Sequence, residues 1–217
     1  MGIVERKERD KELRRHQIMD AATNIFAKKG FSGATIESIA EEADFSPATI
    51  YLYFKNKDEL YASLSLKMLK VLVEKIEFIC NQVNLGPKEK IDALPETLYQ
   101  VYETDPLNVT HLLRYQSTEA LLNLSPELAS RIKDAAQKYI NAMVKIFEEG
   151  VREGVFQDCH PVAFADIVWS IFAGLVLWEG TKKGFDPRKD FLKPTLQLAY
   201  DIVSQGIIKS GAQESGY

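Results

Sequence analysis

The chain has 217 residues, of which 46% are hydrophobic and 27% charged, and its formal net charge at pH 7 is -4. This composition is ordinary for a folded globular protein and excludes a chain that is mostly disordered. The negative net charge also excludes a protein coated in basic residues for nucleic-acid binding, so any basic surface must be local.

The sequence contains no motif for a membrane span, a disulfide framework or a metal site. Apolar runs stay well short of the roughly 18 residues that a spanning helix needs, and the opening stretch MGIVERKERD lacks the apolar core of a signal peptide. We therefore expect a cytoplasmic protein that contacts no membrane. Cys80 and Cys159 form no CxxC pair, which predicts two free, buried thiols. The histidines lack metal-ligand spacing, so neither a metal nor a cofactor is expected.

The first predicted element is an amphipathic helix over about residues 10 to 29. Its apolar residues Ile18, Ala22 and Ile25 recur at helical spacing. Residues 1 to 29 contain eight basic and five acidic side chains, a formal excess of three positive charges. The basic side of the protein is therefore N-terminal, although charge alone is equally compatible with a solvated, mixed-charge helix.

The stretch FSPATIYLYFKNKDEL, residues 45 to 60, is open to two interpretations. Its alternating apolar and aromatic residues are typical of a β-strand, but the flanking signals favour a short helix. Ser46-Pro47 is a helix start, and Asn56 followed by Glu59 is the start of the next helix. A lone strand between two helices would have no partner, so we expect a helix over residues 47 to 54.

A turn at residues 43 to 46 joins this helix to a preceding one over residues 36 to 43. That spacing is typical of a helix-turn-helix, in which the second helix enters the major groove of DNA and the first crosses the backbone. The expected small core consists of Ile39, Ala40, Phe45, Ile50 and Phe54.

Base contacts are expected from the N-terminal part of the second helix, because this part enters the groove most deeply. The residues there are Ser46, Pro47, Ala48 and Thr49. Thr49 can hydrogen-bond to a base, and Ala48 can pack against a thymine methyl group. Since the set lacks Arg and Gln, direct readout should be modest, and DNA shape should supply much of the selectivity.

Phosphate contacts are expected from four residues around the same helix. Thr35 caps the preceding helix, whose positive dipole end suits an anion. The hydroxyl groups of Tyr51 and Tyr53 stand at the ends of rigid rings, which is a common way to hold a phosphate. A cation in the first turn of a helix is locally unfavourable, so an external anion would explain Lys57 better than helix stability does.

The run from Gly30 to Leu60, GFSGATIESIAEEADFSPATIYLYFKNKDEL, resembles the DNA-binding domain of the TetR family of transcriptional regulators. The likeness rests on the G-F...T-I-x-x-I-A-x-x-A core and the I-Y-x-Y-F-K-N-K end. It implies a homodimer whose C-terminal helices bind a small effector. Glu37 departs from the family pattern, because an acid there would repel phosphate. The residues that the resemblance implies to face DNA are Thr35, Pro47, Ala48, Thr49, Tyr51, Tyr53 and Lys57.

Beyond residue 56 we expect six further helices, so the chain should be all-α. Apolar residues recur there with a period of 3.6, and Pro follows a capping residue at several helix starts. Pro95 and Pro194 fall inside expected helices, so each should kink its helix or mark the true start. The nine expected helices span about residues 10 to 29, 36 to 43, 47 to 54, 57 to 83, 88 to 103, 106 to 123, 126 to 153, 161 to 183 and 188 to 209.

The expected domains are a three-helix helix-turn-helix DNA-binding domain over residues 1–56 and a six-helix ligand-binding and dimerisation domain over residues 57–217. Within the second domain, FADIVWSIFAGLVLWEG is apolar nearly all round and must be buried, either in the monomer or between subunits. Ala173 and Gly174 would allow another helix to approach closely. With the family resemblance, this favours a homodimer formed through residues 161–209.

An effector site is expected among the C-terminal helices. Polar residues within THLLRYQSTEALL are candidates, because burying a polar group without a partner costs about 1 to 3 kcal/mol. Aromatic and Met side chains mostly form core, but some are expected to line an apolar pocket, which favours an apolar or aromatic effector. A solvated helix face explains the polar set equally well. The candidate effector residues are His111, Arg114, Tyr115, Glu119, Met143 and Phe172.

Three classes of function follow from these features. The leading hypothesis is a ligand-responsive DNA-binding regulator, expected to be a repressor that binds a palindromic operator as a homodimer. The alternative is an architectural or assembly DNA-binding protein that has no small-molecule effector. An enzyme is disfavoured, because the sequence has no nucleophile elbow, P-loop or Rossmann fingerprint, and no catalytic residue is proposed.

Overall fold

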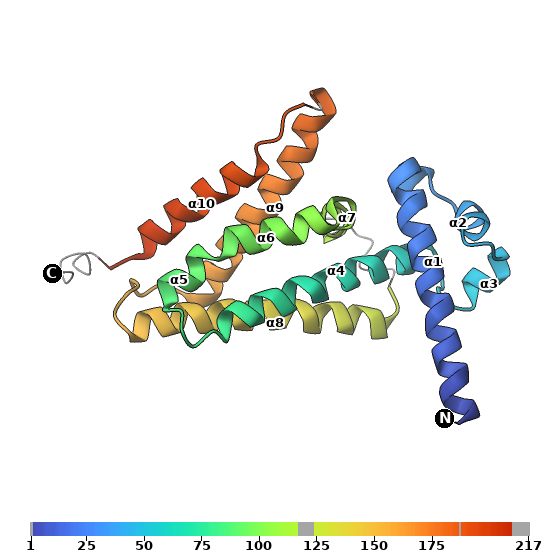
Figure 1. Ribbon diagram of the computed structural model, residues 1–217, viewed down its shortest axis with the longest axis horizontal. Helices are drawn as coiled ribbons and strands as arrows, with labels where there is room; N and C mark the ends of the chain where they lie inside the picture. The colour runs from blue at the N-terminus through green and yellow to red at the C-terminus, as the bar shows by residue number, and fades with distance from the viewer. Residues whose placement is uncertain (1, 117–123, 187, 210–217) are drawn as a thin grey trace. The chain divides into compact units, whose positions relative to one another are not determined.

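The computed structural model describes residues 2–116, 124–186 and 188–209 (Figure 1). Within these residues the regular structure is helical, apart from one isolated bridge between Phe156 and Ile208. The expected all-α class is therefore confirmed. The helices are α1 (Ile3–Gly33), α2 (Ile36–Glu42), α3 (Pro47–Tyr51), α4 (Lys57–Cys80), α5 (Pro87–Asp92), α6 (Leu94–Thr104), α7 (Pro106–Gln116), α8 (Pro126–Arg152), α9 (Pro161–Phe185) and α10 (Leu192–Ile207).

The two prolines that fall inside expected helices both lie in the first turn of a helix. The helix expected over residues 88 to 103 is divided at Ala93 into α5 and α6, and Pro95 is the second residue of α6. Pro194 is the third residue of α10. In a first turn the missing N–H of proline costs no intrahelical hydrogen bond, which is why proline is tolerated there. The helix expected over residues 188 to 209 begins at Leu192 in the structure.

The chain divides into two compact units, each described by itself below. Unit 1 comprises the described residues of 1–67 and 115–131, and unit 2 comprises those of 68–114 and 132–217. Helices α4 and α8 each contribute to both units. The expected domain division between residues 56 and 57 stays a prediction.

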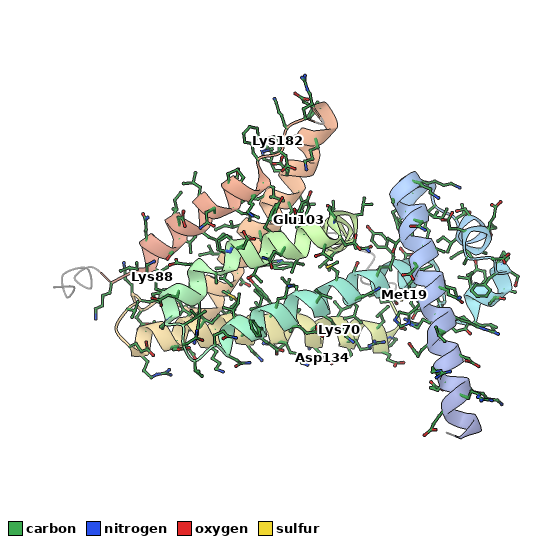
Figure 2. The ribbon with its side chains drawn as sticks, in the orientation of Figure 1. Met19, Lys70, Lys88, Glu103, Asp134 and Lys182 are labelled. Atoms are coloured by element: carbon green, nitrogen blue, oxygen red, sulfur yellow. The ribbon has the colours of Figure 1, made fainter. Side chains whose placement is uncertain are left out.

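In unit 1, α1 packs against α2, and α2 packs against α3. The Phe26 ring of α1 also contacts the Tyr61 ring at the start of α4. Met19, labelled in Figure 2, is among the buried residues of α1. The expected small core is confirmed for Ile39, Ala40, Ile50 and Phe54, whereas Phe45 is only half-buried. The other deeply buried residues of this core are Ile18, Ala22, Ile25, Phe26, Ile36 and Leu60.

Arg15 ties α1 to the end of α3 and the start of α4. Its Nη1 donates to the carbonyl oxygen of Tyr53 at 3.2 Å, and its Nη2 donates to the hydroxyl of Ser63 at 3.1 Å. The guanidinium carbon also lies 4.4 Å from the centre of the Phe54 ring. Burial lowers the pKa of Arg15 from its ordinary value. These contacts hold the segment after α3 against α1.

Unit 2 is held together by an apolar core and a few buried polar links. Helix α10 packs against α5, α6 and α9. The hydroxyl of Tyr200 on α10 donates to the carbonyl oxygen of Val168 on α9 at 2.8 Å. The buried ammonium of Lys90 on α5 forms an ion pair with Glu149 on α8 at 2.8 Å. A buried cation is stabilised only when it is paired, so this link fixes α5 on α8.

Two sequence expectations need correction. Cys80 is buried as expected, but Cys159 is exposed, because it lies in the segment between α8 and α9 rather than in a helix. Helix α9 is also long and apolar enough to cross a membrane by length and composition, with a mean hydropathy of 1.8 in a window that is 28% buried. The expectation that no segment is long and apolar enough to span a membrane was wrong. Isolated polar residues such as Asp166 interrupt the apolar run of α9 but lower its mean hydropathy only slightly. Apolar core helices of soluble proteins meet the same criterion.

Candidate nucleic-acid interface

The turn between α2 and α3 depends on a single left-handed residue, Asp44, whose φ is 57°. The N–H of Asp44 donates to the carbonyl of Glu41 at 3.2 Å, and the N–H of Phe45 donates to that of Ala40 at 2.9 Å. Asp is one of the few non-glycine residues that enter this region readily. The turn therefore ends α2 sharply and sends α3 off in a new direction.

Both helices of the pair begin with the side-chain caps that the sequence predicts. The Thr35 hydroxyl accepts the N–H of Ser38 at 3.2 Å, and the Ser38 hydroxyl oxygen lies 3.2 Å from the N–H of Thr35. The Ser46 hydroxyl accepts the N–H of Thr49 at 3.2 Å and lies 2.9 Å from the Thr49 hydroxyl. Caps of this kind fix where a helix begins. The first turn of α3 is thereby held rigidly.

The surface of α3 separates into a buried side and an exposed side. Ile50 is completely buried, whereas Ser46, Pro47 and Ala48 are exposed and Thr49 is half-buried. The side chain of Tyr51 is 53% exposed. The structure thus places the predicted base-contacting residues together on one accessible surface at the N-terminal end of α3.

Helix α3 ends at Tyr51 rather than at the expected residue 54, so Leu52, Tyr53 and Lys55 lie just beyond it. Tyr53 is half-buried. Leu52 is 80% exposed, and Lys55 is exposed as well. An apolar residue in an alternating pattern gives no signal that it faces solvent, so Leu52 could be found only from the structure. Both residues extend the accessible surface beside Tyr51.

Lys57 has an explanation inside the protein. Its Nζ donates to the carbonyl oxygens of Phe31 at 2.7 Å and Ala34 at 2.9 Å, and it lies 4.4 Å from the centre of the Phe31 ring. These carbonyls belong to the end of α1, where the helix dipole is negative and a cation is favoured. The structure therefore gives Lys57 partners inside the chain, and its contact with DNA stays a prediction. An ammonium has three donors, however, so one is left for a phosphate.

Gly30 creates the geometry that Lys57 uses. Its backbone is in the left-handed region, with φ 68° and ψ 173°, so the helical path of α1 is interrupted there. The N–H of Ala34 then donates back to the carbonyl of Gly30 at 3.2 Å. A side chain would be strained at this φ, which gives a physical reason for glycine. The kink turns the carbonyls of Phe31 and Ala34 toward Lys57.

The start of α4 is capped in a modified way. Asn56 accepts the N–H of Glu59 at 2.7 Å, as the sequence predicts. The carboxylate of Glu59 does not return to Asn56 but accepts the N–H of Lys55 at 2.6 Å and the hydroxyl of Ser125 at 2.7 Å. Ser125 is remote in sequence, so no local pattern predicts this contact. The capping box is replaced by a tertiary link.

Glu37 is exposed in the first turn of α2. An acid is favoured there by the helix dipole, which explains the residue without DNA. Its charge nevertheless opposes any phosphate that approaches Thr35 from the same side. The departure from the family pattern thus has a structural reason within the chain.

Of the six predicted effector residues, only Met143 and Phe172 have side chains that the structure describes, so the predicted effector site stays a prediction. His111, Arg114 and Tyr115 lie on α7, and their side chains are outside the description, as is the whole of Glu119. Met143 on α8 and Phe172 on α9 are buried in unit 2. Neither Met143 nor Phe172 lines the described open groove of about 340 Å³ between α4 and α6. That groove is lined by Glu74, Lys75, Phe78, Ile79, Thr97 and Gln100.

Helices α9 and α10 pack against each other and leave apolar residues uncovered in this single chain. On α9, Ile167 is 53% exposed and Trp178 is 59% exposed, with the exposed Gly174 between them. On α10, Leu198 is 60% exposed and Ile202 is 62% exposed. These positions recur at intervals of four or seven residues, so each helix presents one apolar stripe. We call this surface the α9–α10 face.

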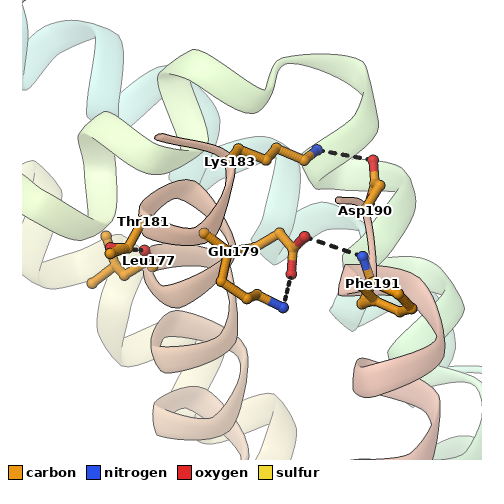
Figure 3. A network of polar contacts seen from close by, with 7 residues as sticks. Leu177, Glu179, Thr181, Lys183, Asp190 and Phe191 are labelled. Atoms are coloured by element: carbon orange, nitrogen blue, oxygen red, sulfur yellow. Dashed lines mark hydrogen bonds and ion pairs between the residues drawn. The ribbon is translucent and has the colours of Figure 1, made fainter. Parts of the chain in front are cut away.

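A polar network holds the connection between α9 and α10 (Figure 3). The buried carboxylate of Glu179 accepts the N–H of Phe191 at 3.1 Å and forms an ion pair with Lys182 at 2.6 Å. Lys183 forms a second ion pair with Asp190 at 2.8 Å. Because Phe191 directly precedes α10, the Glu179 carboxylate anchors the beginning of that helix to the end of α9. The network keeps the two stripes of the α9–α10 face in register.

Comparison with known proteins places the helix-turn-helix in a sequence family. Residues 18–64 match the family described as "Bacterial regulatory proteins, tetR family". This range contains all of α2 and α3, with most of the α1 core and the start of α4. The match includes every residue predicted to contact DNA.

Relatives extend the similarity beyond the helix-turn-helix. The chain is 28% identical over 149 residues to the fatty acid metabolism regulator protein of Bacillus subtilis, covering 69% of this chain and 74% of the relative. It is 29% identical over 205 residues to the HTH-type transcriptional repressor SCO4008 of Streptomyces coelicolor, covering 89% and 98%. The structure of FadR from Bacillus subtilis in complex with stearoyl-CoA has a TM-score of 0.67 at 22% identity, covering 88% and 98%, and shows the shared fold.

Proposed function

We propose that this chain, which belongs to the TetR family of helix-turn-helix transcriptional regulators, is a repressor that binds a palindromic operator as a homodimer and is released by a small effector. The observation that carries the proposal is the capped, exposed N-terminal end of α3. The family is one of regulators rather than enzymes. The sign of regulation is supported by the relative SCO4008, which is described as a repressor. Such a protein acts on DNA, and we infer a cytoplasmic location.

The N-terminal end of α3 reads the operator. Pro47 and Ala48 present apolar surface that fits a thymine methyl group, while Thr49 adds a hydroxyl for a base edge. The Thr49 hydroxyl already lies 2.9 Å from that of Ser46, so the two act as one hydrogen-bonding unit. With so few base-specific donors, groove width and DNA flexibility contribute much of the specificity.

Phosphates on either side of the groove are held by a second group of residues. Tyr51 projects its hydroxyl from the exposed side of α3, and Tyr53 follows it in the turn. Lys57 offers its remaining donor from the start of α4. Thr35 stands at the N-terminus of α2, where exposed backbone N–H groups attract an anion. These contacts set the orientation of α3 in the groove.

Two substitutions in α3 test the reading helix. The target is an inverted repeat in the DNA that flanks the gene, measured by fluorescence anisotropy. Tyr51→Phe removes a phosphate contact and should weaken binding to every sequence alike, with a smaller salt dependence. Thr49→Ala should change the preference at one or two base positions by about 1 to 3 kcal/mol. Lys138→Gln, on α8, is the control, and unchanged affinity in both α3 variants would remove α3 as the reader.

The homodimer is proposed to form through the α9–α10 face, within residues 161–209. The support is an apolar stripe on each helix, which a single chain leaves exposed to water. Two copies related by a two-fold axis would cover both stripes with a four-helix contact. A palindromic operator then follows, because the two copies present two symmetric α3 helices.

Gly174→Arg tests this interface cleanly. A Cβ built at Gly174 meets nothing within 4 Å, so the variant should fold normally as a monomer. In a dimer, however, the guanidinium would be forced between two apolar helices, where an unpaired charge is costly. Sedimentation should therefore show folded monomer. A Gly180→Arg variant shows the effect of the same substitution elsewhere on α9, because a side chain at Gly180 also has open space around it. A well-folded, dimeric Gly174→Arg protein would place the interface elsewhere.

The effector is proposed to be a small molecule with a large apolar part, and a fatty acyl-CoA is the first class to test. This choice rests on the relative described as a fatty acid metabolism regulator. It agrees with the apolar character of the helices that would surround a ligand, which include the buried Met143 and Phe172. The contribution of His111, Arg114, Tyr115 and Glu119 belongs to the same proposal.

Reciprocal binding distinguishes a regulator from an architectural DNA-binding protein. An effector that releases the operator must bind more weakly when the operator is present, by the same factor. Acyl-CoA of increasing chain length and a set of aromatic acids are titrated with and without operator, and Met143→Trp is expected to blunt the response by filling the site. If no compound alters operator affinity, the architectural alternative is favoured.

A further inference from the structure

The N-terminal half of α1 carries a row of basic side chains that the proposed reading helix does not use. Lys7, Lys11 and Arg14 are all exposed, and we call them the basic stripe. None of the three forms an ion pair within the described residues, although Lys28 further along the same helix pairs with Glu42 at 3.2 Å. The stripe lies before Ile18, the first residue of α1 in the core of unit 1.

Helical geometry places the stripe on a definite side of α1. Lys7, Lys11, Arg14 and Ile18 follow one another at intervals of four, three and four residues, so they share one face. Ile18 is completely buried, which makes this the face that packs against the other helices of unit 1. At a rise of about 1.5 Å per residue, the stripe spans roughly 10 Å. Figure 1 shows the N-terminal half of α1 extending past α2 and α3.

Most charges on this half of α1 are sorted by face, although Asp10 lies beside the stripe, three residues after Lys7 and four before Arg14. Glu5, Glu8 and Glu12 also recur at intervals of three and four residues, but on a neighbouring face. Lys7 and Lys11 stand one turn apart with like charge, an arrangement that destabilises an isolated helix. Asp10 offsets part of the charge of the stripe, but none of the three basic side chains forms an ion pair within the described residues, so they are available to an anion from outside.

We propose that the basic stripe binds phosphates of the DNA that flanks the half-site read by α3, as a second and sequence-independent contact. This inference rests on the proposed function, because it needs an operator. The stripe lies on the side of α1 that faces α2 and α3, and it spans more than one phosphate spacing. A membrane surface fits less well, because Leu13 is the single apolar residue between positions 5 and 17 and an interfacial helix needs an apolar face.

A matched pair of double variants tests the stripe. Lys7→Gln/Lys11→Gln removes two charges from the stripe, while Arg6→Gln/Arg9→Gln removes two from the same segment but from other faces. Operator affinity is measured by anisotropy between about 50 and 200 mM salt. If the basic stripe of each subunit binds two phosphates, the slope of log K against log salt should fall in magnitude by about 1.8 per subunit in the first variant. The loss of affinity of this variant relative to the wild type should accordingly be about tenfold smaller per subunit at the high end of the salt range than at the low end.

The length of the DNA provides an independent readout. On a duplex trimmed to the inverted repeat, the first double variant should match the wild type, because the flanking phosphates are gone. Equal salt slopes for both double variants on the long duplex would overturn the stripe, and so would stripe-dependent binding to vesicles of anionic lipid without an effect on DNA. If the wild type binds no operator at all, it is the proposed function that fails.

Discussion

Replacing Lys57 with Met separates the structural role of this residue from its proposed contact with DNA. The substitution keeps the apolar stem but removes the ammonium, which donates to the carbonyls of Phe31 at 2.7 Å and Ala34 at 2.9 Å and lies over the Phe31 ring. A hydrogen bond from a charged group contributes about 1.5 to 3 kcal/mol, and a cation–π contact at an exposed site contributes about 0.5 to 1 kcal/mol.

The half-buried position of Lys57 reduces these values, because the freed carbonyls at the end of α1 can bind water. We therefore expect a loss of about 2 to 3 kcal/mol in the free energy of unfolding, which is less than the full sum of these terms. Urea unfolding followed by circular dichroism should show a midpoint lower by about 1 M. Lys55→Met, at an exposed neighbouring site, should change stability by less than about 0.5 kcal/mol.

The same variant reports on DNA separately. Under conditions where it is fully folded, Lys57→Met should bind the operator more weakly, with a salt slope smaller by about 0.9 for each phosphate that the side chain no longer neutralises. A midpoint equal to that of the wild type would refute the structural reasoning, whatever the result with DNA. Lower stability with unchanged operator affinity would confine Lys57 to its role inside unit 1.

Three further predictions concern stability. Gly150→Ala should destabilise the protein by about 1 to 2 kcal/mol despite a better helix propensity, because the new Cβ would lie 2.0 Å from the buried Phe156 ring; Gly150→Ala/Phe156→Leu should recover most of the loss in urea unfolding. Asp44→Val should cost about 1 to 3 kcal/mol in the same assay, because a β-branched residue is strained at φ 57°, whereas Asp44→Asn should be neutral. Burial raises the pKa of Tyr139, so as the pH rises the unfolded chain loses the Tyr139 proton before the folded chain does. The contribution of Tyr139 to the free energy of unfolding is therefore complete below about pH 10 and is lost as the pH rises further. Tyr139→Phe should therefore flatten the fall in unfolding free energy above about pH 10, and an unchanged slope would contradict this assignment.

Local signals in the sequence were sufficient for the all-α class and for the position of the helix-turn-helix. Thr35, Ser46 and Asn56 cap their helices as expected, and each cap reaches a residue three positions along the chain. A bond of that length depends on the backbone of one turn, so the sequence alone specifies it. For the same reason the stretch after Ser46 could be identified as a helix in spite of its strand-like alternation.

The exposed or buried state of individual residues followed less well from sequence. Leu52 belongs to an apolar alternation but faces solvent, and Cys159 was expected to be buried but is exposed. The face that a short helix or a connecting segment turns to the core depends on the neighbours that pack on it. A helix of five residues such as α3 is too short for its periodicity to establish that face.

The all-α class, the helix-turn-helix and the group of residues around α3 could be derived from local patterns, because these depend on contacts within a few positions of the chain. The roles of Lys57 and Glu59 emerge only when the chain is folded. Lys57 binds carbonyls more than twenty residues earlier, and Glu59 binds Ser125 in a different segment. Contacts of this kind form when distant segments pack together, and no periodicity or capping pattern along the chain specifies which segments will meet.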